Sequence, residues 1–388
     1  MQFEWSPETR QRIAAARDFA EKTLRPRGRS EGLDHAGWQA AARFGVFRSA
    51  MPPRFGLGRS RDGSNGALVS AALFEAMGRG GADRGLLFAM GAHLFGCLVP
   101  LAAYATDWQA AEWEELLRDG SAVGALAATE AAGGSSFEHI ACEAAPAIDG
   151  YRITGGKTLV ANAPAAGLFI VLARHAGQRG PMSLTAFLVP VGSEGLSVCP
   201  IAADGLAGAP IGTATFVDCF VRNDAVLGRP GAGLRVFSTA MQWERSCLLA
   251  GLLGAAERDL ALCRDFLAAR HDSGGPLLRH QALSHRLARI KLSLDGARLL
   301  LYRAASLLDA GHDDRAAAAA AKLAVSEAVV AAATDSFRLL AGAGWRGEVG
   351  DPVTAVTDTL GGLLASGTTE MQLEILARHL PSDGERAC

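Results

Sequence analysis

Groupings of cysteine and histidine that hold metals are missing from this sequence. The seven cysteines are scattered over 388 residues, without a CxxC pair or any other zinc-type spacing. Cysteines distributed in this way are typical of reduced, mostly buried side chains. The nine histidines form no ligand pair at helical spacing, apart from the weak neighbourhood of His280 and His285. We therefore predict no metal site.

A strong excess of charge is also missing, and so is a long apolar run. The formal net charge is −2 and charged residues make up 20% of the chain, which argues against nucleic-acid binding as the main role. No apolar run reaches the roughly 18 residues that a membrane-spanning helix needs. The first residues do not follow the plan of a signal peptide. We expect a cytoplasmic protein without a membrane partner.

Three successive patterns of apolar residues divide the chain, which is long enough for two or three packed units. Residues 1–120 have helical spacing and begin with a Ser6-Pro7 cap. Residues 121–229 consist of short alternating segments joined by Gly, Pro and Asp, as in a small barrel or sandwich. Residues 230–388 are helical again. The pattern predicts an α+β chain with an N-terminal helical domain, a middle β domain and a C-terminal helical bundle.

Two features of the last region favour a bundle. One face of a long helix is apolar, and it carries Leu283, Leu287, Ile290, Leu294, Ala297 and Leu301. The alanine-rich segment Arg315–Leu340 can pack closely on its neighbours through small side chains. We interpret this segment as part of a bundle or of an oligomer face rather than as a linker.

The most informative stretch runs from Ser121 to Ala163. An alanine-rich strand ends in Thr129-Glu130 and is followed by the small-residue run Ala131-Ala132-Gly133-Gly134-Ser135-Ser136. Such a run lets backbone amides and small hydroxyls approach a flat or phosphate-bearing ligand closely. Further on, Asp149-Gly150 between two alternating segments predicts a tight hairpin. Ordinary turns in a β-sandwich would give the same spacing.

The order of these pieces resembles the middle domain of the acyl-CoA dehydrogenase family. The matching residues are Thr129, Glu130, Gly134, Ser135, Asp149, Gly150, Tyr151, Gly155, Lys157 and Asn162. The resemblance extends over nearly the whole chain and implies FAD as cofactor and a C-terminal four-helix bundle. Leu159 and Ala161 depart from the family pattern, in which a Trp and a Thr lie against the flavin at these positions.

The resemblance also implies the chemistry, in which a carboxylate takes the α-proton while a hydride leaves the β-carbon. The family usually carries this base in a Tyr-Glu-Gly-Thr motif, but here Ser366 occupies its position, before Gly367 and Thr368. A hydroxyl has too high a pKa to replace it unaided. Isovaleryl-CoA and long-chain members carry the base at the position of Glu244. Apolar neighbours would raise the pKa of Glu244 towards that of a useful base, although a solvated carboxylate beside Arg245 is the alternative.

Further positions follow from the resemblance. FAD contacts are expected from Ala128, Thr129, Gly134, Ser135, Ala161, Thr368 and Glu370, and, across a subunit interface, from Arg270, Gln281, Arg338 and Gly342. The substrate pocket is expected to include His93, Trp243, Ser366 and Gly367. A histidine such as His93 on an apolar helix is more often a satisfied core residue. Ser273 replaces the Phe of the subunit-crossing FAD motif, so several cofactor contacts are altered.

Local matches around Met241–Leu248, Ala92–Pro100 and Ser366–Arg378 resemble the L-prolyl-carrier-protein dehydrogenases of natural-product biosynthesis. This resemblance implies an acyl or aminoacyl group held by a phosphopantetheinylated carrier protein, or else a CoA thioester. It also implies a homodimer or homotetramer, with electron-transfer flavoprotein or oxygen as electron acceptor. Carrier domains are usually acidic, so we expect a basic docking patch, and Arg279, His280, Arg286 and Arg289 are candidates unless they form an ordinary solvated face.

Three other functions stay open at this point. The chain could be an acyl-CoA dehydrogenase for short or branched acyl-CoA. It could be a flavin monooxygenase on the same scaffold, for which the altered Leu159 and Ala161 are the support. It could also be a descendant that binds little flavin and recognises a thioester without redox chemistry, as the altered cofactor contacts would permit.

Overall fold

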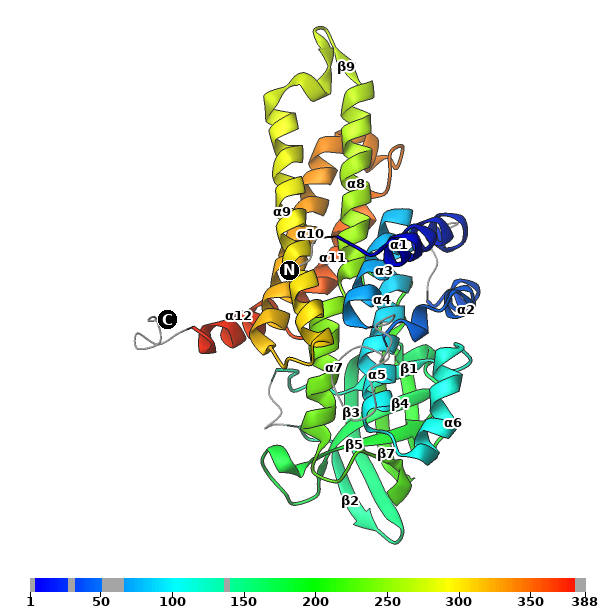
Figure 1. The fold of residues 1–388 in the computed structure, drawn as a ribbon. Helices are drawn as coiled ribbons and strands as arrows, with labels where there is room; N and C mark the ends of the chain where they lie inside the picture. The colour runs from blue at the N-terminus through cyan, green and yellow to red at the C-terminus, as the bar shows by residue number, and fades with distance from the viewer. Residues whose placement is uncertain (1–3, 27–31, 51–65, 136–139, 381–388) are drawn as a thin grey trace.

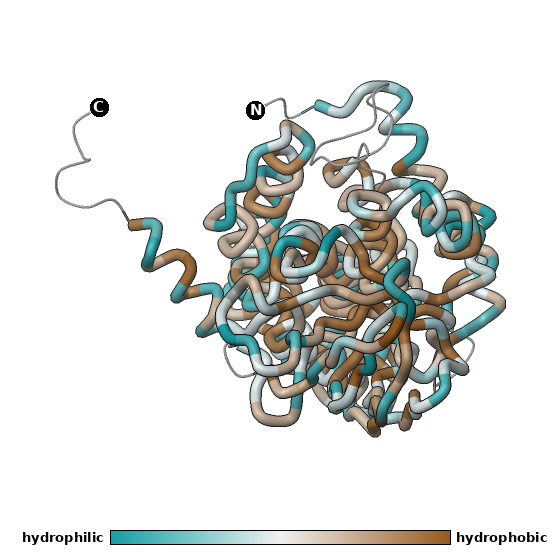
Figure 2. Tube along the Cα trace, turned by 90° about the horizontal axis from the view of Figure 1, so that it is seen from below, coloured by the Kyte–Doolittle hydropathy of each residue, from teal (hydrophilic) through white to brown (hydrophobic). Residues whose placement is uncertain are grey.

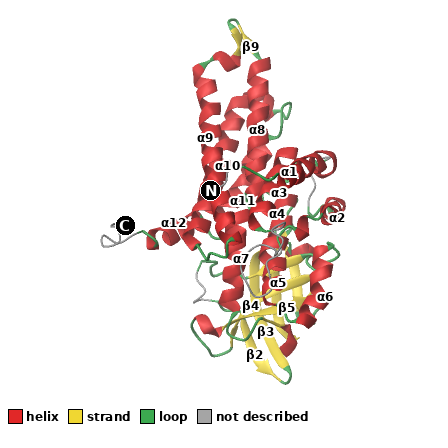
Figure 3. Ribbon diagram, in the orientation of Figure 1, coloured by secondary structure: helices red, strands yellow, loops and turns green. Residues whose placement is uncertain are grey.

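The structure is a computed structural model that describes residues 4–26, 32–50, 66–135 and 140–380. Its helices and strands are segregated, with the sheet at one end of an elongated molecule and a long helical bundle at the other (Figures 1 and 3). This arrangement confirms the predicted α+β fold with helical, β and helical parts. Ser136, the last residue of the small-residue run, and Cys388 lie outside the described residues.

The N-terminal part is a set of helices packed beside the bundle. Its helices are α1 (Pro7–Phe19), α2 (His35–Phe44), α3 (Ala67–Gly80), α4 (Arg84–Gly91), α5 (Val99–Tyr104) and α6 (Asp107–Arg118). The Ser6 side chain accepts a hydrogen bond from the Thr9 amide and so caps α1 as predicted. A π-helical segment, Ala92–Leu98, joins α4 to α5 and is entirely buried.

The middle part is one eight-stranded sheet whose strands follow the order β6-β7-β3-β2-β4-β5-β8, with β1 parallel to β4. The strands are β1 (Gly124–Ala127), β2 (Glu143–Ala147), β3 (Gly150–Ala161), β4 (Leu168–His175), β5 (Leu184–Pro190), β6 (Leu196–Pro200), β7 (Ile211–Arg222) and β8 (Val226–Leu227). The Thr158 amide donates to the Thr129 carbonyl (2.9 Å), which joins the end of β1 to β3. The sheet has a hydrophobic cluster of its own, to which β1, β2, β3, β4, β5, β7 and β8 contribute.

The hairpin between β2 and β3 is shifted by one residue from its predicted position. Ala147 pairs with Gly150, so Ile148 and Asp149 form the turn, and Asp149 has a φ of 60°. Gly150 was expected to be a turn residue, but it is the first residue of β3. Glycine is needed there because β7 passes close by, so that a Cβ atom would lie 2.1 Å from the Val221 carbonyl oxygen.

The C-terminal part is a bundle built around one central helix. Its helices are α7 (Gly233–Cys247), α8 (Ala250–Ala269), α9 (Gln281–Asp309), α10 (Arg315–Trp345), α11 (Pro352–Leu364) and α12 (Thr369–Arg378), and the short strands β9 (His271–Asp272) and β10 (Gly275–Pro276) join α8 to α9. The alanine-rich α10 packs against α7, α8, α9, α11 and α12, so the interpretation as a bundle helix is confirmed. The helix α12 projects away from the body (Figures 1 and 2).

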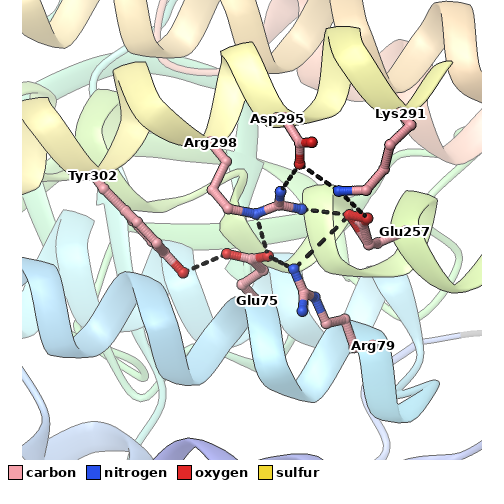
Figure 4. A network of polar contacts seen from close by, with 7 residues as sticks. All are labelled: Glu75, Arg79, Glu257, Lys291, Asp295, Arg298 and Tyr302. Carbon is pink, nitrogen blue, oxygen red and sulfur yellow. Dashed lines mark hydrogen bonds and ion pairs between the residues drawn. The ribbon is translucent and has the colours of Figure 1, made fainter. Parts of the chain in front are cut away.

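A polar network ties the N-terminal helices to the bundle (Figure 4). Glu75 on α3 accepts from Arg298 Nε (2.8 Å) and from the Tyr302 hydroxyl (2.5 Å), both on α9. Glu257 on α8 binds Arg298 (2.5 Å) and Lys291 (3.2 Å). Because Arg298 and both carboxylates are largely buried, these contacts fix the relative positions of three helices.

The expectation about apolar runs needs correction. By length and composition, two helical stretches, Arg84–Tyr104 and Arg315–Trp345, are apolar enough to cross a membrane. The first is buried throughout its apolar window and the second for the larger part of it. Both behave as core helices of a globular fold, in which neighbouring helices cover the apolar side chains.

Candidate active site

Glu244 is a buried carboxylate near the end of α7. It is 8% exposed, and its Oε1 atom faces Gly96 of the π-helical segment, where an added Cβ would lie only 2.5 Å away. Burial raises the pKa of Glu244 to about 7, although the Ser366 hydroxyl and Arg245 favour the charged form. A carboxylate in this setting can take up or release a proton near neutral pH. The alternative of a solvated Glu244 is wrong.

The loop between α11 and α12 brings Ser366 to this carboxylate. The Ser366 hydroxyl donates to Glu244 Oε2 at 2.7 Å. Ser366 and Gly367 both have left-handed backbone angles, with φ of 56° and 97°. Two predicted pocket residues, Ser366 and Gly367, therefore lie next to the predicted base.

Buried side chains from three helices hold this loop in place. Arg245 Nε donates to the Ser366 carbonyl (3.0 Å), and Gln372 Nε2 donates to the carbonyls of Ser366 (3.2 Å) and Gly367 (2.9 Å). Lys322 on α10 is 1% exposed and donates to the Leu363 carbonyl (2.9 Å). Burial, helped by the positive charge of Arg245, lowers the pKa of Lys322 to about 8.

A cavity of about 730 Å³ opens beside the loop. Its walls come from α5, α7 and α12 and from the segments before β5 and α7, and they include Tyr104, Met182, Met241, Arg245 and Ile375. Arg245 lies between the cavity and the Ser366–Glu244 pair, since its side chain lines the cavity and donates to the Ser366 carbonyl. The arrangement suits a ligand whose reactive end reaches a buried carboxylate.

A second group of predicted residues lies where β1 meets β3. The buried Glu130 binds Lys157 Nζ (2.7 Å) and the amides of Ala141 (2.7 Å) and Cys142 (3.0 Å). Burial opposes the charge on Glu130, but Lys157 and the two amides outweigh it and hold the pKa of this carboxyl below its ordinary value. Lys157 also donates to the Ala128 carbonyl (3.2 Å). These contacts fix the backbone of Ala128 and Thr129.

The residues after Glu130 form an exposed surface of small side chains. Gly134 and Ser135 are exposed, and the position of a Cβ on Gly133 would meet no atom within 4 Å. On the adjoining β3, Leu159 is 62% exposed with a left-handed φ of 52°, and Ala161 is half-buried. This open platform, which we define as residues 128–129 and 131–135 together with Leu159 and Ala161, fits a flat ring system with a phosphate-bearing tail.

Three buried polar atoms near these groups lack a hydrogen-bond partner among the described residues. They are Asn162 Oδ1, Trp243 Nε1 and Gln372 Oε1. Asn162 follows the platform on β3 and donates to the Ala89 carbonyl (2.9 Å), Trp243 precedes Glu244, and Gln372 holds the Ser366 loop. Buried polar atoms without partners are uncommon, and one of them, Gln372 Oε1, belongs to the side chain that holds the Ser366 loop.

Six predicted cofactor contacts lie elsewhere in the chain. Arg270 and Gln281 flank the β9–β10 tip at the end of the molecule opposite the sheet (Figure 1). Arg338 and Gly342 are exposed on the last turns of α10, where Ala341 departs from helical geometry. Thr368 caps α12 and Glu370 is exposed on its first turn. Within a single chain, the predicted contacts of the subunit interface therefore do not lie beside the platform.

The structure places two predicted pocket residues in the core. Trp243 is fully buried and stacks on Phe95, with ring centroids 6.3 Å apart. His93 is also fully buried, its Nδ1 accepting from the Gly124 amide (2.8 Å) and its Nε2 lying 3.0 Å from the Leu117 carbonyl. Burial lowers the pKa of His93 to about 4. Because both ring nitrogens are engaged, the expectation that His93 lines the substrate pocket is corrected to a core role.

Several residues of the site could not be singled out from the sequence. Gly96 is one of 46 glycines, and only its approach to Glu244 distinguishes it. Gln372 and Lys322 lie on helices with ordinary patterns, although a lysine in an alanine-rich apolar segment is a signal that could have been followed. The described residues contain no group of three or more His, Cys, Asp or Glu side chains placed to hold a metal.

Profiles of the acyl-CoA dehydrogenase family match three successive parts of the chain. The N-terminal domain matches residues 6–121, the middle domain residues 125–219 and the C-terminal domain residues 231–380. An L-prolyl-(peptidyl-carrier protein) dehydrogenase of Pseudomonas fluorescens is 36% identical over 345 residues, which cover 88% of this chain and 89% of that protein. The mitochondrial short-chain specific acyl-CoA dehydrogenase of Homo sapiens is 29% identical over 380 residues, covering 96% and 90%.

A solved structure described as PigA with FAD and proline has the same fold. It superposes with a TM-score of 0.90 at 32% sequence identity, covering 97% of this chain and 98% of that chain. The agreement extends over all three parts described above.

Proposed function

This chain belongs to the acyl-CoA dehydrogenase family, and we propose that it is an FAD-dependent dehydrogenase of an acyl or aminoacyl thioester. The thioester is carried by a phosphopantetheinylated carrier protein, and its acyl group is prolyl or similar. The observation that carries the proposal is the buried Glu244, whose pKa is about 7 and whose carboxylate is held by Ser366. The similarity to an L-prolyl-(peptidyl-carrier protein) dehydrogenase supports the carrier-bound substrate.

In this reaction Glu244 acts as the general base. Its carboxylate takes the proton from the α-carbon, and a hydride leaves the β-carbon, so that a single carbon–carbon bond becomes double. Bound FAD supplies the hydride acceptor. Near neutral pH a large fraction of Glu244 is deprotonated, and its burial keeps bulk water away from the transfer. Ser366 orients the carboxylate, while Arg245 and Gln372 keep Ser366 in position.

The open platform would hold the flavin. Thr129, Leu159 and Ala161 would lie against the ring system, and Gly134 and Ser135 would meet the phosphate-bearing part. Leu159 and Ala161 present apolar surface to the ring without a hydroxyl. Arg270, Gln281, Arg338 and Gly342 would complete the site from a second copy of the chain. Arg270 and Gln281 flank the β9–β10 tip, which lies at the opposite end of the molecule from the sheet that carries the platform (Figure 1). We therefore propose a dimer or a larger oligomer.

The test is the visible absorption spectrum of the purified protein, before and after addition of a prolyl-loaded carrier protein. We expect a flavin band that bleaches on addition. Glu244→Gln should retain the flavin band but lose bleaching, because an amide of the same shape cannot accept the proton. Bleaching by the Glu244→Gln variant would overturn the assignment of the base.

The same measurement separates the other functions. A flavin band that bleaches with short acyl-CoA but not with the carrier would favour an acyl-CoA dehydrogenase. Bleaching only by a separate reductase would favour a monooxygenase. Absence of flavin after incubation with FAD would favour a thioester-binding protein without redox chemistry. The rate at which the bleached protein recovers with oxygen or with electron-transfer flavoprotein identifies the electron acceptor.

A further inference from the structure

The cavity that Arg245 lines opens onto a continuous depression in the surface. The cavity of about 730 Å³ shares Arg229 with a neighbouring cavity of about 520 Å³, and it shares Met182 and Gly231 with another of about 480 Å³. All three lie where the start of α7 meets the sheet. Anything large that delivers a thioester to the inner cavity would therefore cover this part of the surface.

Positive charge surrounds the mouth of the cavity. Arg229, Arg235 and Arg315 are exposed and line it, whereas Asp313 is the one carboxylate among its described lining residues. Among the described residues Arg229 and Arg235 form no ion pair, and Asp224, which lines the neighbouring cavity with Arg229, is paired with Arg222 (3.0 Å). Arg235 lies over the Tyr104 ring (5.9 Å), and Arg315 is 3.8 Å from Asp313. The mouth therefore carries uncompensated charge.

Exposed apolar side chains accompany these arginines. Met182 is 73% exposed and lines two of the three cavities, and Trp108 is 55% exposed and lines the third. An apolar centre with charged residues at its edge is the usual composition of a protein–protein interface.

The basic patch expected from the sequence is placed differently. Arg279, His280, Arg286 and Arg289 lie at or near the β9–β10 tip, at the end of the molecule opposite the sheet (Figure 1). Three of these side chains are already paired, Arg279 (3.3 Å) and His280 (2.5 Å) with Asp272, and Arg286 with Asp335 (3.6 Å). A carrier bound there would present its thioester far from Glu244 of the same chain.

We propose that an acidic carrier protein docks over the mouth of the cavity, against Arg229, Arg235 and Arg315, and inserts its phosphopantetheine arm towards Arg245. The docking face, defined by these three arginines with Met182 and Trp108, rests on the proposed function because it assumes a carrier-bound thioester. Charge complementarity at such a rim mainly accelerates association and selects the partner.

The test compares the double variant Arg229→Glu/Arg235→Glu with Arg286→Glu/Arg289→Glu, in which two arginines near the far tip are reversed. The dissociation constant of prolyl-loaded carrier is measured by fluorescence anisotropy at low and at physiological salt. We expect roughly tenfold weaker binding for the mouth variant, a smaller salt dependence than in the original protein, and no change for the tip variant. Bleaching by the corresponding prolyl-pantetheine thioester should fall much less than binding of the carrier in the mouth variant, and should stay unchanged in the tip variant.

Three results would overturn the docking face: unchanged carrier affinity in the mouth variant, an equal loss in the tip variant, or an equal loss with the small pantetheine thioester. A loss confined to CoA thioesters would instead assign the arginines to nucleotide phosphates, and would also overturn it. Because binding is measured apart from turnover, a carrier that binds at the mouth without bleaching the flavin would refute the reaction and leave the docking face standing.

Discussion

The pairing of Glu244 with Ser366 decides how basic the buried carboxylate is. Burial raises the pKa of Glu244, and the hydroxyl of Ser366 opposes this rise by donating at 2.7 Å. Replacing Ser366 by Ala removes a donor that favours the charged form, so the pKa should rise further. A hydrogen bond to a charged group contributes about 1.5–3 kcal/mol, which corresponds to a change of about one pH unit or more.

Ser366→Ala is therefore expected to move the acidic limb of the kcat/KM–pH profile upward by about one pH unit. Activity increases with pH through the pKa of the base, which must be deprotonated to act, so at pH 7 the variant should be slower and at high pH it should recover. Ser238→Ala is a control, because Ser238 lies on α7, the helix that carries Glu244, and lines the cavity. A profile that falls in height without moving would mean that Ser366 only shapes the loop.

Glu244 could be identified because its position resembles that of the base in isovaleryl-CoA and long-chain members, and because Trp243 and Cys247 beside it favour burial. That information is local. The partners of Glu244 are not local. Gly96 precedes it by more than a hundred residues and Ser366 follows it by 122. Their contacts depend on how the π-helical segment and the loop before α12 pack against α7. The role of Gln372 became recognisable only with that packing, because it donates to backbone carbonyls that no sequence pattern marks. Lys322 stands out in an alanine-rich segment, but its carbonyl partner could not be foreseen.

Among the elements, β3 is held to β1 by a buried ion pair and to β7 by an exposed one. Lys157 and Glu130 are 0% and 7% exposed, whereas Arg152 and Asp218 are 49% and 65% exposed. Lys157→Met should destabilise the fold by about 3–5 kcal/mol, because it leaves a buried carboxylate unpaired. Arg152→Met, on the same strand, should cost at most about 1 kcal/mol.

Urea unfolding at neutral pH measures both variants. Adding Glu130→Gln to Lys157→Met should restore part of the lost stability, since it removes the unpaired charge. The native pKa of Glu130 lies below its ordinary value, so the pair stabilises the fold above the unfolded-state pKa and loses this contribution as the pH falls. The deficit of Lys157→Met should therefore shrink in acid. If Lys157→Met and Arg152→Met lower the free energy of unfolding equally, burial of the Lys157–Glu130 pair does not increase its contribution to stability.

Most elements could be predicted because their apolar spacing is long and regular. The face of α9 and the strands from β3 to β7 are examples. The two-residue strand β8 is too short to show a period, and the distortion of α10 at Ala341 occurs in a segment of uniform small residues. The hairpin turn was predicted one residue too late because Gly150 was interpreted as a turn residue. Glycine is required at this position because β7 passes close to it.

At the scale of the whole molecule, the cofactor residues are divided between two ends. Arg270 is exposed at the end of α8, near the Phe266 ring (5.7 Å), and has no carboxylate partner within the described ranges. If it binds the FAD of a second copy, Arg270→Ala should weaken FAD binding by roughly tenfold or more, since paired charged contacts contribute about 1.5–3 kcal/mol. Flavin absorbance retained after gel filtration measures the loss.

Arg264→Ala is the matched control, because Arg264 lies on the same helix and is already paired with Asp265 (2.7 Å). Flavin retention should also fall on dilution, as subunits separate, and it should fall earlier in Arg270→Ala than in Arg264→Ala. Full retention in Arg270→Ala at every concentration would assign the phosphate contacts to the platform alone.

The meeting of Ser366 with Glu244 also bears on how such sites diverge. Two positions that lie 122 residues apart, one on a rigid helix and one on a loop, reach the same point in space. A mutation at either codon can therefore supply or withdraw the proton acceptor without remodelling the scaffold. A lineage that passes through a form with acidic groups at both positions can shift its base from helix to loop and then lose the original. The place of the catalytic carboxylate in the site is therefore conserved more strictly by the fold than by the position in the sequence that supplies it.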